Sequence, residues 1–139
     1  MSRLTLPVEE FTTPNPITVA ATSPVEEVAD LMKKHGIRHL PVVTGKAVVG
    51  IISERDVRVA ANLSRKEKML VRASDVMVAE PVTVSAGASL DDVAFEMSQN
   101  KIGSVLVNDE NDEFLGIFTV TDALNALIEI ARAVQSDEE

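Results

Sequence analysis

Apolar residues recur along the chain at helical spacing and then in short runs, and this alternation predicts helices and strands in turn. The sequence Ser23-Pro24-Val25-Glu26 combines a capping box with a proline at the first helical position, so a helix is expected to begin there. Gly36 is expected to end it as a C-terminal glycine. The apolar stripe at i, i+3, i+4 and i+7 consists of Val25, Val28, Ala29 and Met32.

Two apolar runs after this helix predict a β-hairpin. They cover residues 40–43 and 47–52, and the intervening Thr44-Gly45-Lys46 contains the glycine that tight turns favour. A short strand is expected over residues 17–19, and a second helix over residues 53–63. Residues 1–15 predict an irregular lead-in with Phe11 as its apolar anchor.

The same order of elements returns about 65 residues later, so the chain contains an internal repeat. Pro16-Ile17-Thr18-Val19 aligns with Pro81-Val82-Thr83-Val84, and Met32 aligns with Met97. Half a chain of roughly 60 residues would bury little apolar surface alone, so the two copies are expected to pack together. We therefore predict an α+β (α/β sandwich-like) fold with two βαββα repeats packed sheet against sheet about a pseudo-twofold axis.

The repeat predicts a division of the chain into four parts. Residues 8–63 form the first repeat, 64–74 a linker, 75–132 the second repeat and 133–139 an acidic tail. The linker carries four cations, and a solvated linker is favoured over a binding patch. These cations are Arg65, Lys66, Lys68 and Arg72.

Composition and charge narrow the function classes. The chain has no cysteine, which excludes a thiol nucleophile, a disulfide framework and a thiolate metal site. Its net charge is −9, but residues 1–75 are near +2, with eleven Lys or Arg against nine Asp or Glu. Such acidity argues against nucleic acid as a partner and leaves room for one small anionic ligand at a local positive site.

The first residues lack the apolar core of a signal peptide, and no uncharged run approaches the roughly 18 residues of a membrane span. The sequence therefore predicts a cytoplasmic protein without a membrane partner.

One short motif occurs twice, as Gly50-Ile51-Ile52-Ser53-Glu54-Arg55-Asp56 and Gly116-Ile117-Phe118-Thr119-Val120-Thr121-Asp122. In each copy the apolar pair is expected to end a strand and the aspartate to begin a helix, with the hydroxyl residue at the N-cap. Such a place suits an anion. The alternative is that both aspartates are plain helix-start acids and both hydroxyl residues plain caps.

With these features in duplicate, the chain resembles a tandem pair of cystathionine-β-synthase-type (CBS) domains, a Bateman module, over about residues 8–130. The resemblance rests on the repeated elements, both motifs, the two Thr-containing strands and Ile37-Arg38-His39-Leu40-Pro41-Val42. It implies a regulatory module that needs no cofactor and has two clefts between its repeats. These clefts would hold an adenosyl ligand: AMP, ADP or ATP first, with S-adenosylmethionine or NAD as further possibilities.

The resemblance also implies roles for individual residues. Asp56 and Asp122 would hold ribose hydroxyls, Ser53, Thr119, Arg38 and His39 would reach phosphate, and Thr18 and Thr83 would lie near the adenine. The second copy has Gly103 and Ser104 where the first has Arg38 and His39. The two clefts are therefore expected to differ, with one competent site and one that is weaker or empty.

The last helix is apolar around most of its circumference, and either an intramolecular core or a contact with another chain would explain this. The resemblance implies a homodimer through this helix and an effector protein that the module regulates. A competing function is a ligand-free dimerisation or interaction subunit with the same fold. The apolar residues of this helix include Leu124, Leu127, Ile128, Ile130, Ala131 and Val134.

Catalysis and metal binding are not expected. The sequence has no nucleophile with a base at motif spacing and no P-loop. Residues 109–113 are as acidic as a calcium loop, but Phe114 stands where the sixth-position glycine belongs, which favours a hairpin turn. No catalytic residue and no metal ligand are predicted.

Overall fold

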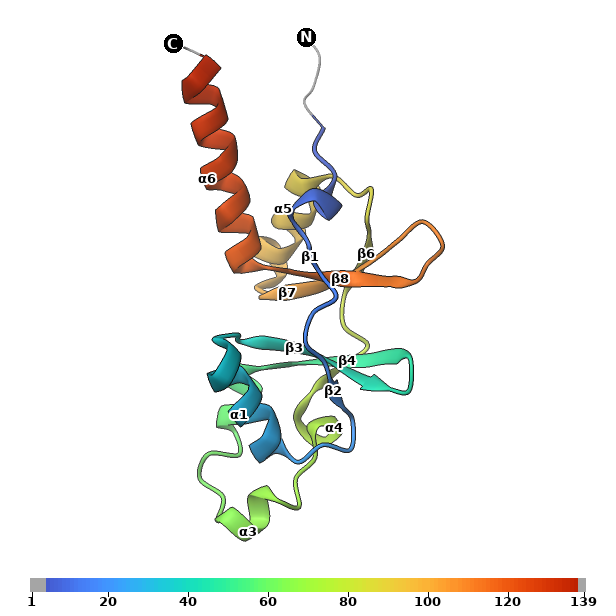
Figure 1. Ribbon diagram of the computed structural model, residues 1–139, viewed down its shortest axis with the longest axis vertical. Coiled ribbons are helices and arrows are strands. Elements are labelled where there is room, and N and C mark those ends of the chain that lie inside the picture. The colour runs from blue at the N-terminus through green and yellow to red at the C-terminus, as the bar shows by residue number, and fades with distance from the viewer. Residues whose placement is uncertain (1–4, 138–139) are drawn as a thin grey trace. The chain divides into compact units, whose positions relative to one another are not determined.

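The computed structural model describes residues 5–137 and contains two compact units, each built on its own four-stranded sheet (Figure 1). Residues 16–81 form one unit, called here the N unit. Residues 5–15 and 82–137 form the other, called here the C unit. The predicted α+β class is confirmed.

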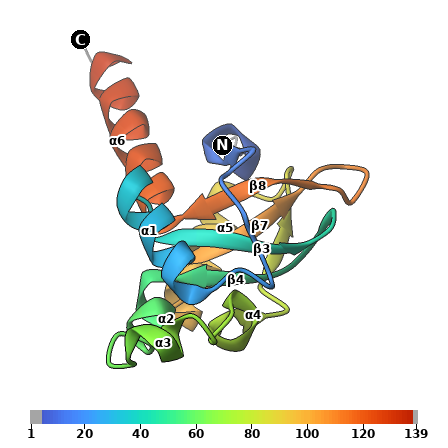
Figure 2. The ribbon, with the colours of Figure 1, turned by 60° about the horizontal axis from the view of Figure 1, so that its bottom comes forward.

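The N unit has the strand order β2-β3-β4-β5, with β2 parallel to β3 and the other pairs antiparallel. The hairpin of β3 and β4 is clear in both ribbon views (Figure 1, Figure 2). The elements of the N unit are β2 Val19–Ala20, α1 Val25–His35, β3 His39–Thr44, β4 Ala47–Ser53, α2 Glu54–Arg58, α3 Arg65–Lys68, α4 Ala73–Val76 and β5 Val78–Ala79.

The C unit repeats this plan with the strand order β1-β8-β7-β6. Its core gathers Val8, Val93, Met97 and Phe118, all of them buried. Its elements are the 3-10 helix η1 Val8–Phe11, β1 Thr13–Pro14, β6 Thr83–Ser85, α5 Leu90–Asn100, β7 Ser104–Asn108, β8 Phe114–Thr119 and α6 Val120–Asp137. The last helix runs through residues 133–137 of the predicted tail, while Glu138 and Glu139 lie outside the described residues.

The leading segment of each repeat packs with the other repeat. β1 opens the first repeat but pairs with β8 in the C unit, and β5 opens the second repeat but pairs with β4 in the N unit. Val8 and Ala73, which are 65 positions apart, are both fully buried in these exchanged positions. The expected irregular lead-in is therefore an ordered part of a core, with Val8 rather than half-buried Phe11 as its deepest anchor.

Two local predictions are wrong. α1 begins at Val25 with Pro24 as its N-cap, and no side chain caps it, so the expected capping box is absent. The reason is tertiary, because the Val25 N–H donates to the carbonyl oxygen of Val71 at 2.8 Å. α2 ends at Arg58, and turns replace the last residues of the expected helix. Gly36 does end α1, at a φ of 63°.

The glycine of each motif allows the exchanged strand to pass closely. A Cβ on Gly116 would lie 2.2 Å from the carbonyl oxygen of Thr13. A Cβ on Gly50 would lie 2.5 Å from the Met77 sulfur and 2.8 Å from the carbonyl oxygen of Val78. The role of this glycine is therefore close backbone approach beside the site.

Candidate functional site

The first motif places its hydroxyl and its carboxylate in direct contact at the end of β4. Asp56 Oδ2 accepts hydrogen bonds from the Ser53 N–H at 2.8 Å and the Ser53 hydroxyl at 2.9 Å. The Asp56 N–H donates in return to Ser53 Oγ at 3.2 Å. This is a capping box, so the cap role weighed from the sequence is realised. Among residues 5–137, no hydrogen bond reaches the other oxygen, Asp56 Oδ1.

The second motif repeats this geometry and adds one bond. Asp122 Oδ2 accepts from the Thr119 N–H at 2.9 Å and from the Thr119 hydroxyl at 3.1 Å, and the Asp122 N–H donates to Thr119 Oγ1 at 3.3 Å. In addition, the Thr13 hydroxyl donates to Asp122 Oδ1 at 3.2 Å. Sequence reasoning missed Thr13, which is 109 positions away.

The predicted phosphate role of the two hydroxyl residues meets a constraint in this geometry. A serine or threonine hydroxyl has one proton to donate. Ser53 and Thr119 each donate that proton to their own aspartate. A phosphate contact would therefore require the hydroxyl to turn away from the carboxylate.

Arg38 and His39 lie beside the first motif. His39 pairs with Ser53 across β3 and β4, and the Glu54 N–H donates to the Arg38 carbonyl oxygen at 2.8 Å. The Arg38 side chain is 81% exposed, and its Nε lies 3.5 Å from Glu54 Oε2. Such an exposed ion pair holds a guanidinium only weakly. Arg38 is therefore free to turn toward a nearby anion.

Glu54 interacts more closely with Arg58 than with Arg38. Its Oε1 accepts a hydrogen bond from Arg58 Nη2 at 3.0 Å. That hydrogen bond, with the charges of Arg58 and Arg38, lowers the pKa of the Glu54 carboxyl. Glu54 is therefore ionised and forms ion pairs with both Arg38 and Arg58.

His39 is half-buried, and its burial lowers the pKa of the imidazole below the ordinary value of 6.5. The charge of Asp56 acts in the opposite direction, and the charge of Arg38 lowers the pKa further. The side chain is therefore neutral at pH 7, next to an aspartate that would favour its protonated form.

The C unit has the same backbone arrangement but lacks counterparts of the Arg38 and His39 side chains. Ser104 pairs with Thr119 as His39 pairs with Ser53, and the Val120 N–H donates to the Gly103 carbonyl oxygen at 3.1 Å. Gly103 and Ser104 bring no positive charge to this edge. The two motifs therefore share a backbone and differ in side-chain chemistry.

The two threonines predicted near the adenine lie farther from the motifs than Arg38 and His39 do. Thr18 is exposed just before β2, and Thr83 is the exposed first residue of β6. In each unit one strand, β3 or β7, separates them from the strand that carries the motif. Two strand spacings amount to roughly 10 Å. A ligand that touched both within one unit would have to span that width.

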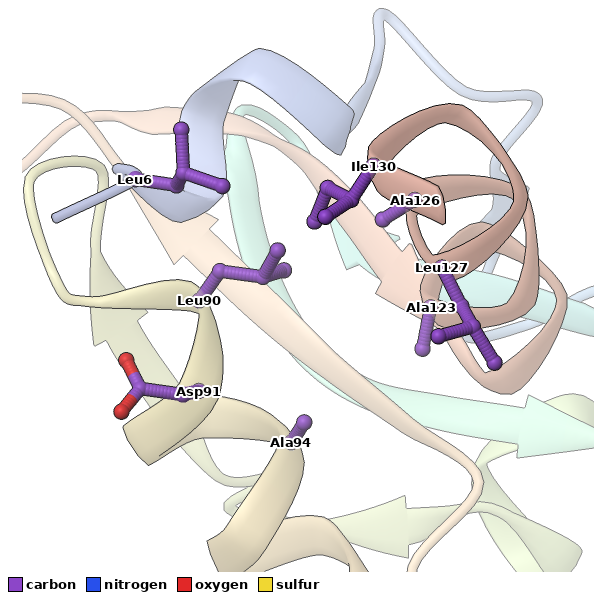
Figure 3. A pocket seen from close by; sticks show the side chains of 8 residues that line it. All are labelled: Leu6, Leu90, Asp91, Ala94, Ala123, Ala126, Leu127 and Ile130. Carbon is purple, nitrogen blue, oxygen red and sulfur yellow. The ribbon is translucent and has the colours of Figure 1, made fainter. Parts of the chain in front are cut away.

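A hollow of about 380 Å³ lies elsewhere in the C unit, between α5, α6 and the segment before η1 (Figure 3). It is apolar apart from Asp91, and none of the eight residues predicted to bind ligand lines it. It therefore does not match the predicted nucleotide site. The lining residues are Leu6, Leu90, Asp91, Ala94, Ala123, Ala126, Leu127 and Ile130.

One lining residue of this hollow, Leu127, belongs to a set of exposed apolar side chains on α5 and α6. α6 buries the small Ala126, which is 1% exposed, and leaves Leu127 62% exposed. An intramolecular core therefore accounts for only part of the apolar character of α6. The exposed large apolar residues of α5 and α6 are Phe95, Val120, Leu124, Leu127, Ile128 and Val134.

The acidic segment after β7 forms a tight turn. Asp109 Oδ1 accepts from the Asn111 N–H at 2.8 Å and the Glu113 N–H at 3.0 Å. Within residues 5–137, no three His, Cys, Asp or Glu side chains gather as metal ligands would. In the same part of the chain, no helix has the length and apolar character needed to cross a membrane.

Comparison with known proteins gives matches over nearly the whole chain. The CBS domain family model matches residues 8–62 and 73–129. The crystal structure of AcuB from Vibrio cholerae is 30% identical with a TM-score of 0.84, covering 98% of this chain and 99% of that chain. The CBS domain pair of protein MJ0100, in complex with 5′-methylthioadenosine and S-adenosyl-L-methionine, is 27% identical with a TM-score of 0.75, covering 96% and 99%.

An enzyme is also among the relatives. The inosine-5′-monophosphate dehydrogenase of Korarchaeum cryptofilum is 35% identical over 122 residues, which is 88% of this chain and 24% of that protein. The chain spans about a fifth to a quarter of the length of this dehydrogenase and of two other curated relatives that it matches. The similarity therefore concerns one part of those proteins.

Proposed function

Because the chain belongs to the CBS domain family and carries two CBS domains, over residues 8–62 and 73–129, we propose that it is a regulatory module that binds an adenosyl compound. AMP, ADP or ATP is the first choice, with S-adenosylmethionine and NAD as the alternatives. The compound is a ligand whose occupancy is passed to an effector protein. The module itself catalyses no reaction and needs no cofactor.

The observation that carries this proposal is the state of the Asp56 carboxylate. Its Oδ2 is held by Ser53, and its Oδ1 is left without a partner among residues 5–137. A carboxylate fixed in this way is ready to accept hydrogen bonds from the hydroxyls of a ribose. Such bonds to a charged group contribute about 1.5 to 3 kcal/mol.

The charges near the first motif favour a ligand that carries phosphate. Arg38 is exposed and weakly paired, and His39 is neutral with an aspartate beside it. A phosphate close to His39 would raise the pKa of the imidazole and add a second cation. The second motif has no such pair, so we assign phosphate-bearing ligands to the first motif. The relative MJ0100, in complex with two adenosyl compounds, supports the adenosyl class.

Regulation requires that the ligand prefer one arrangement of the protein over another. A ligand that bound two arrangements equally would change nothing in a partner. We propose that the module is a homodimer joined through the exposed apolar residues of α6. The dimer would present its effector with a surface that depends on occupancy.

The test of this function is calorimetric titration with AMP, ADP, ATP, S-adenosylmethionine, NADH and a cyclic dinucleotide. We expect one adenine nucleotide to bind, with one tight site per chain. The titration with AMP is repeated in buffers of different ionisation enthalpy. A binding enthalpy that changes with the ionisation enthalpy of the buffer would report proton uptake by His39. No binding of any adenosyl compound would contradict the proposal.

A ligand-free interaction subunit is the second candidate, and the exposed apolar residues of α5 and α6 favour it. Thermal unfolding separates the two functions. Ligand at about 100 times its dissociation constant adds about 2.7 kcal/mol to the free energy of unfolding. If none of the six compounds raises the melting temperature while the protein still dimerises, the interaction function stands.

A further inference from the structure

We propose that the two motifs hold a ribose differently, and that Thr13 is the residue that makes them differ. The Asp56 carboxylate can accept both sugar hydroxyls, whereas the Asp122 carboxylate can accept only one. The Asp122 motif would therefore tolerate a deoxyribose that the Asp56 motif rejects. This inference rests on the proposed function, since it concerns how the same ligand is held.

The argument begins with the capacity of a carboxylate. An ionised aspartate has two oxygens and about four lone-pair positions that accept hydrogen bonds. At Asp56, two of these are filled, by the N–H and the hydroxyl of Ser53, and both lie on Oδ2. Two positions remain on Oδ1, which is the number that the two vicinal hydroxyls of a ribose require.

The same count at Asp122 leaves one position. Thr119 fills two positions on Oδ2, as Ser53 does in the other motif. The Thr13 hydroxyl fills one of the two on Oδ1, at 3.2 Å. A ribose at this motif could therefore give one hydroxyl to the carboxylate, unless Thr13 gave up its bond.

The backbone of Thr13 is held in place on both sides. β1 pairs with β8, with Thr13 opposite Ile117, so close that Gly116 has no room for a Cβ. Thr12 donates from its hydroxyl to the Val8 carbonyl oxygen at 2.8 Å, and Val8 is fully buried. The Thr13 hydroxyl is thus held over Asp122 by a rigid segment.

The N unit has a valine at the equivalent place. Thr13 stands opposite Ile117, two residues before Thr119, and Val78 stands opposite Ile51, two residues before Ser53. Val78 has the shape of a threonine but no hydroxyl to donate. The difference between the two carboxylates is therefore set by one pair of equivalent residues, which can be exchanged.

The experiment measures the binding of AMP, 2′-deoxy-AMP and 3′-deoxy-AMP by calorimetry, with one motif disabled at a time. Asp56→Asn leaves the Asp122 motif, and Asp122→Asn leaves the Asp56 motif. In the Asp122→Asn protein, both deoxy compounds should bind about tenfold more weakly than AMP. In the Asp56→Asn protein, at least one of them should bind within about twofold of AMP.

Three further substitutions test the roles of Thr13 and Val78. Adding Thr13→Val to Asp56→Asn should make both deoxy compounds about tenfold weaker than AMP, while Thr13→Ser, which keeps the hydroxyl, should leave the ratios as they were. Adding Val78→Thr to Asp122→Asn should bring one deoxy compound back to the affinity of AMP. The Val78→Thr result decides the inference even if the Asp122 motif binds no ligand.

The inference is overturned if AMP binds but Thr13→Val and Val78→Thr leave the ratios of AMP to the deoxy compounds unchanged. An equal loss for all three compounds in Thr13→Val would also overturn it, because Thr13 would then support the fold only. If AMP binds to neither disabled protein nor to the wild type, the proposed function fails, and this inference fails with it.

Discussion

At the scale of single residues, the aspartate of each motif caps a helix and is also the residue that we propose contacts the ligand. Oδ2 of Asp56 caps α2 through Ser53, and Oδ1 accepts no hydrogen bond among residues 5–137. The cap fixes the rotamer of the side chain before a ligand arrives, so little conformational entropy is lost on binding. The two functions weighed for this residue, cap and ligand contact, are compatible because they use different oxygens.

The pKa of His39 predicts how stability depends on pH. Burial lowers the pKa of the folded imidazole below 6.5, its ordinary value, so the unfolded chain binds the proton more readily. The free energy of unfolding should therefore be highest above about pH 6.5 and should fall as the pH drops toward the lowered pKa. Urea unfolding at pH 7.5 and pH 5.5 measures this.

The control for this prediction is His39→Gln, which has no titrating ring. The loss of stability between the two pH values should be smaller in His39→Gln than in the wild type. An equal loss in both proteins would show that other groups cause the pH dependence.

The motif glycines predict unequal costs of the same substitution. Gly116→Ala would press a methyl group against the Thr13 backbone, which cannot move aside without breaking β1 from β8. Gly50→Ala meets the flexible Met77 side chain and, at 2.8 Å, the Val78 carbonyl oxygen, which is a milder backbone clash than the 2.2 Å contact at Gly116. We expect losses of about 3 kcal/mol for Gly116→Ala and about 1 kcal/mol for Gly50→Ala, measured by urea unfolding. Equal and small losses would mean that the exchanged strands do not pass as closely as described.

Sequence reasoning could reach the motif residues but not the number of free acceptors on each carboxylate. The recurrence of glycine, hydroxyl and aspartate predicted the caps at Ser53 and Thr119, because those contacts lie within three residues. The bond from Thr13 to Asp122 spans 109 residues and depends on which strand β1 joins. Local spacing contains no information about such a contact.

At the scale of elements, our proposals rest on two features, the exchanged leading strands and the last helix. β1 and β5 each place one residue beside the motif of the other repeat. The 65-residue shift contained this signal, since it aligns Val8 with Ala73 and Thr13 with Val78. The shift alone could not say which sheet each strand would join.

The exposed face of α6 predicts a dimer that one charge disrupts. Leu127 is 62% exposed, so Leu127→Lys should leave the fold intact while placing a charge in the proposed interface. Sedimentation velocity should show a dimer for the wild type and a monomer for Leu127→Lys. Glu129→Lys, which changes another exposed residue of α6, is the matched control and should remain a dimer. A wild-type monomer would contradict the dimer.

At the scale of the whole molecule, the two units have very different charge. The N unit carries ten Lys or Arg against eight Asp or Glu, whereas the C unit, over residues 5–15 and 82–137, carries two against twelve. A phosphate-bearing ligand is therefore favoured in the N unit, where Arg38 and His39 also lie. The repeat gives both units an equivalent strand order, while their side chains give the two units different charge.

The affinity of the Asp56→Asn protein for AMP shows most directly whether Asp56 holds a ligand. Asparagine keeps an oxygen that can accept the Ser53 hydrogen bonds, so α2 remains capped, but it can place a donor where Oδ1 met the ribose. We expect AMP to bind about tenfold to a hundredfold more weakly, with an unchanged melting temperature for the free protein. Asp122→Asn, tested in parallel, should leave the tighter AMP site intact. An affinity equal to the wild type in Asp56→Asn would contradict a ligand contact at Asp56, which would then be a helix cap and nothing more.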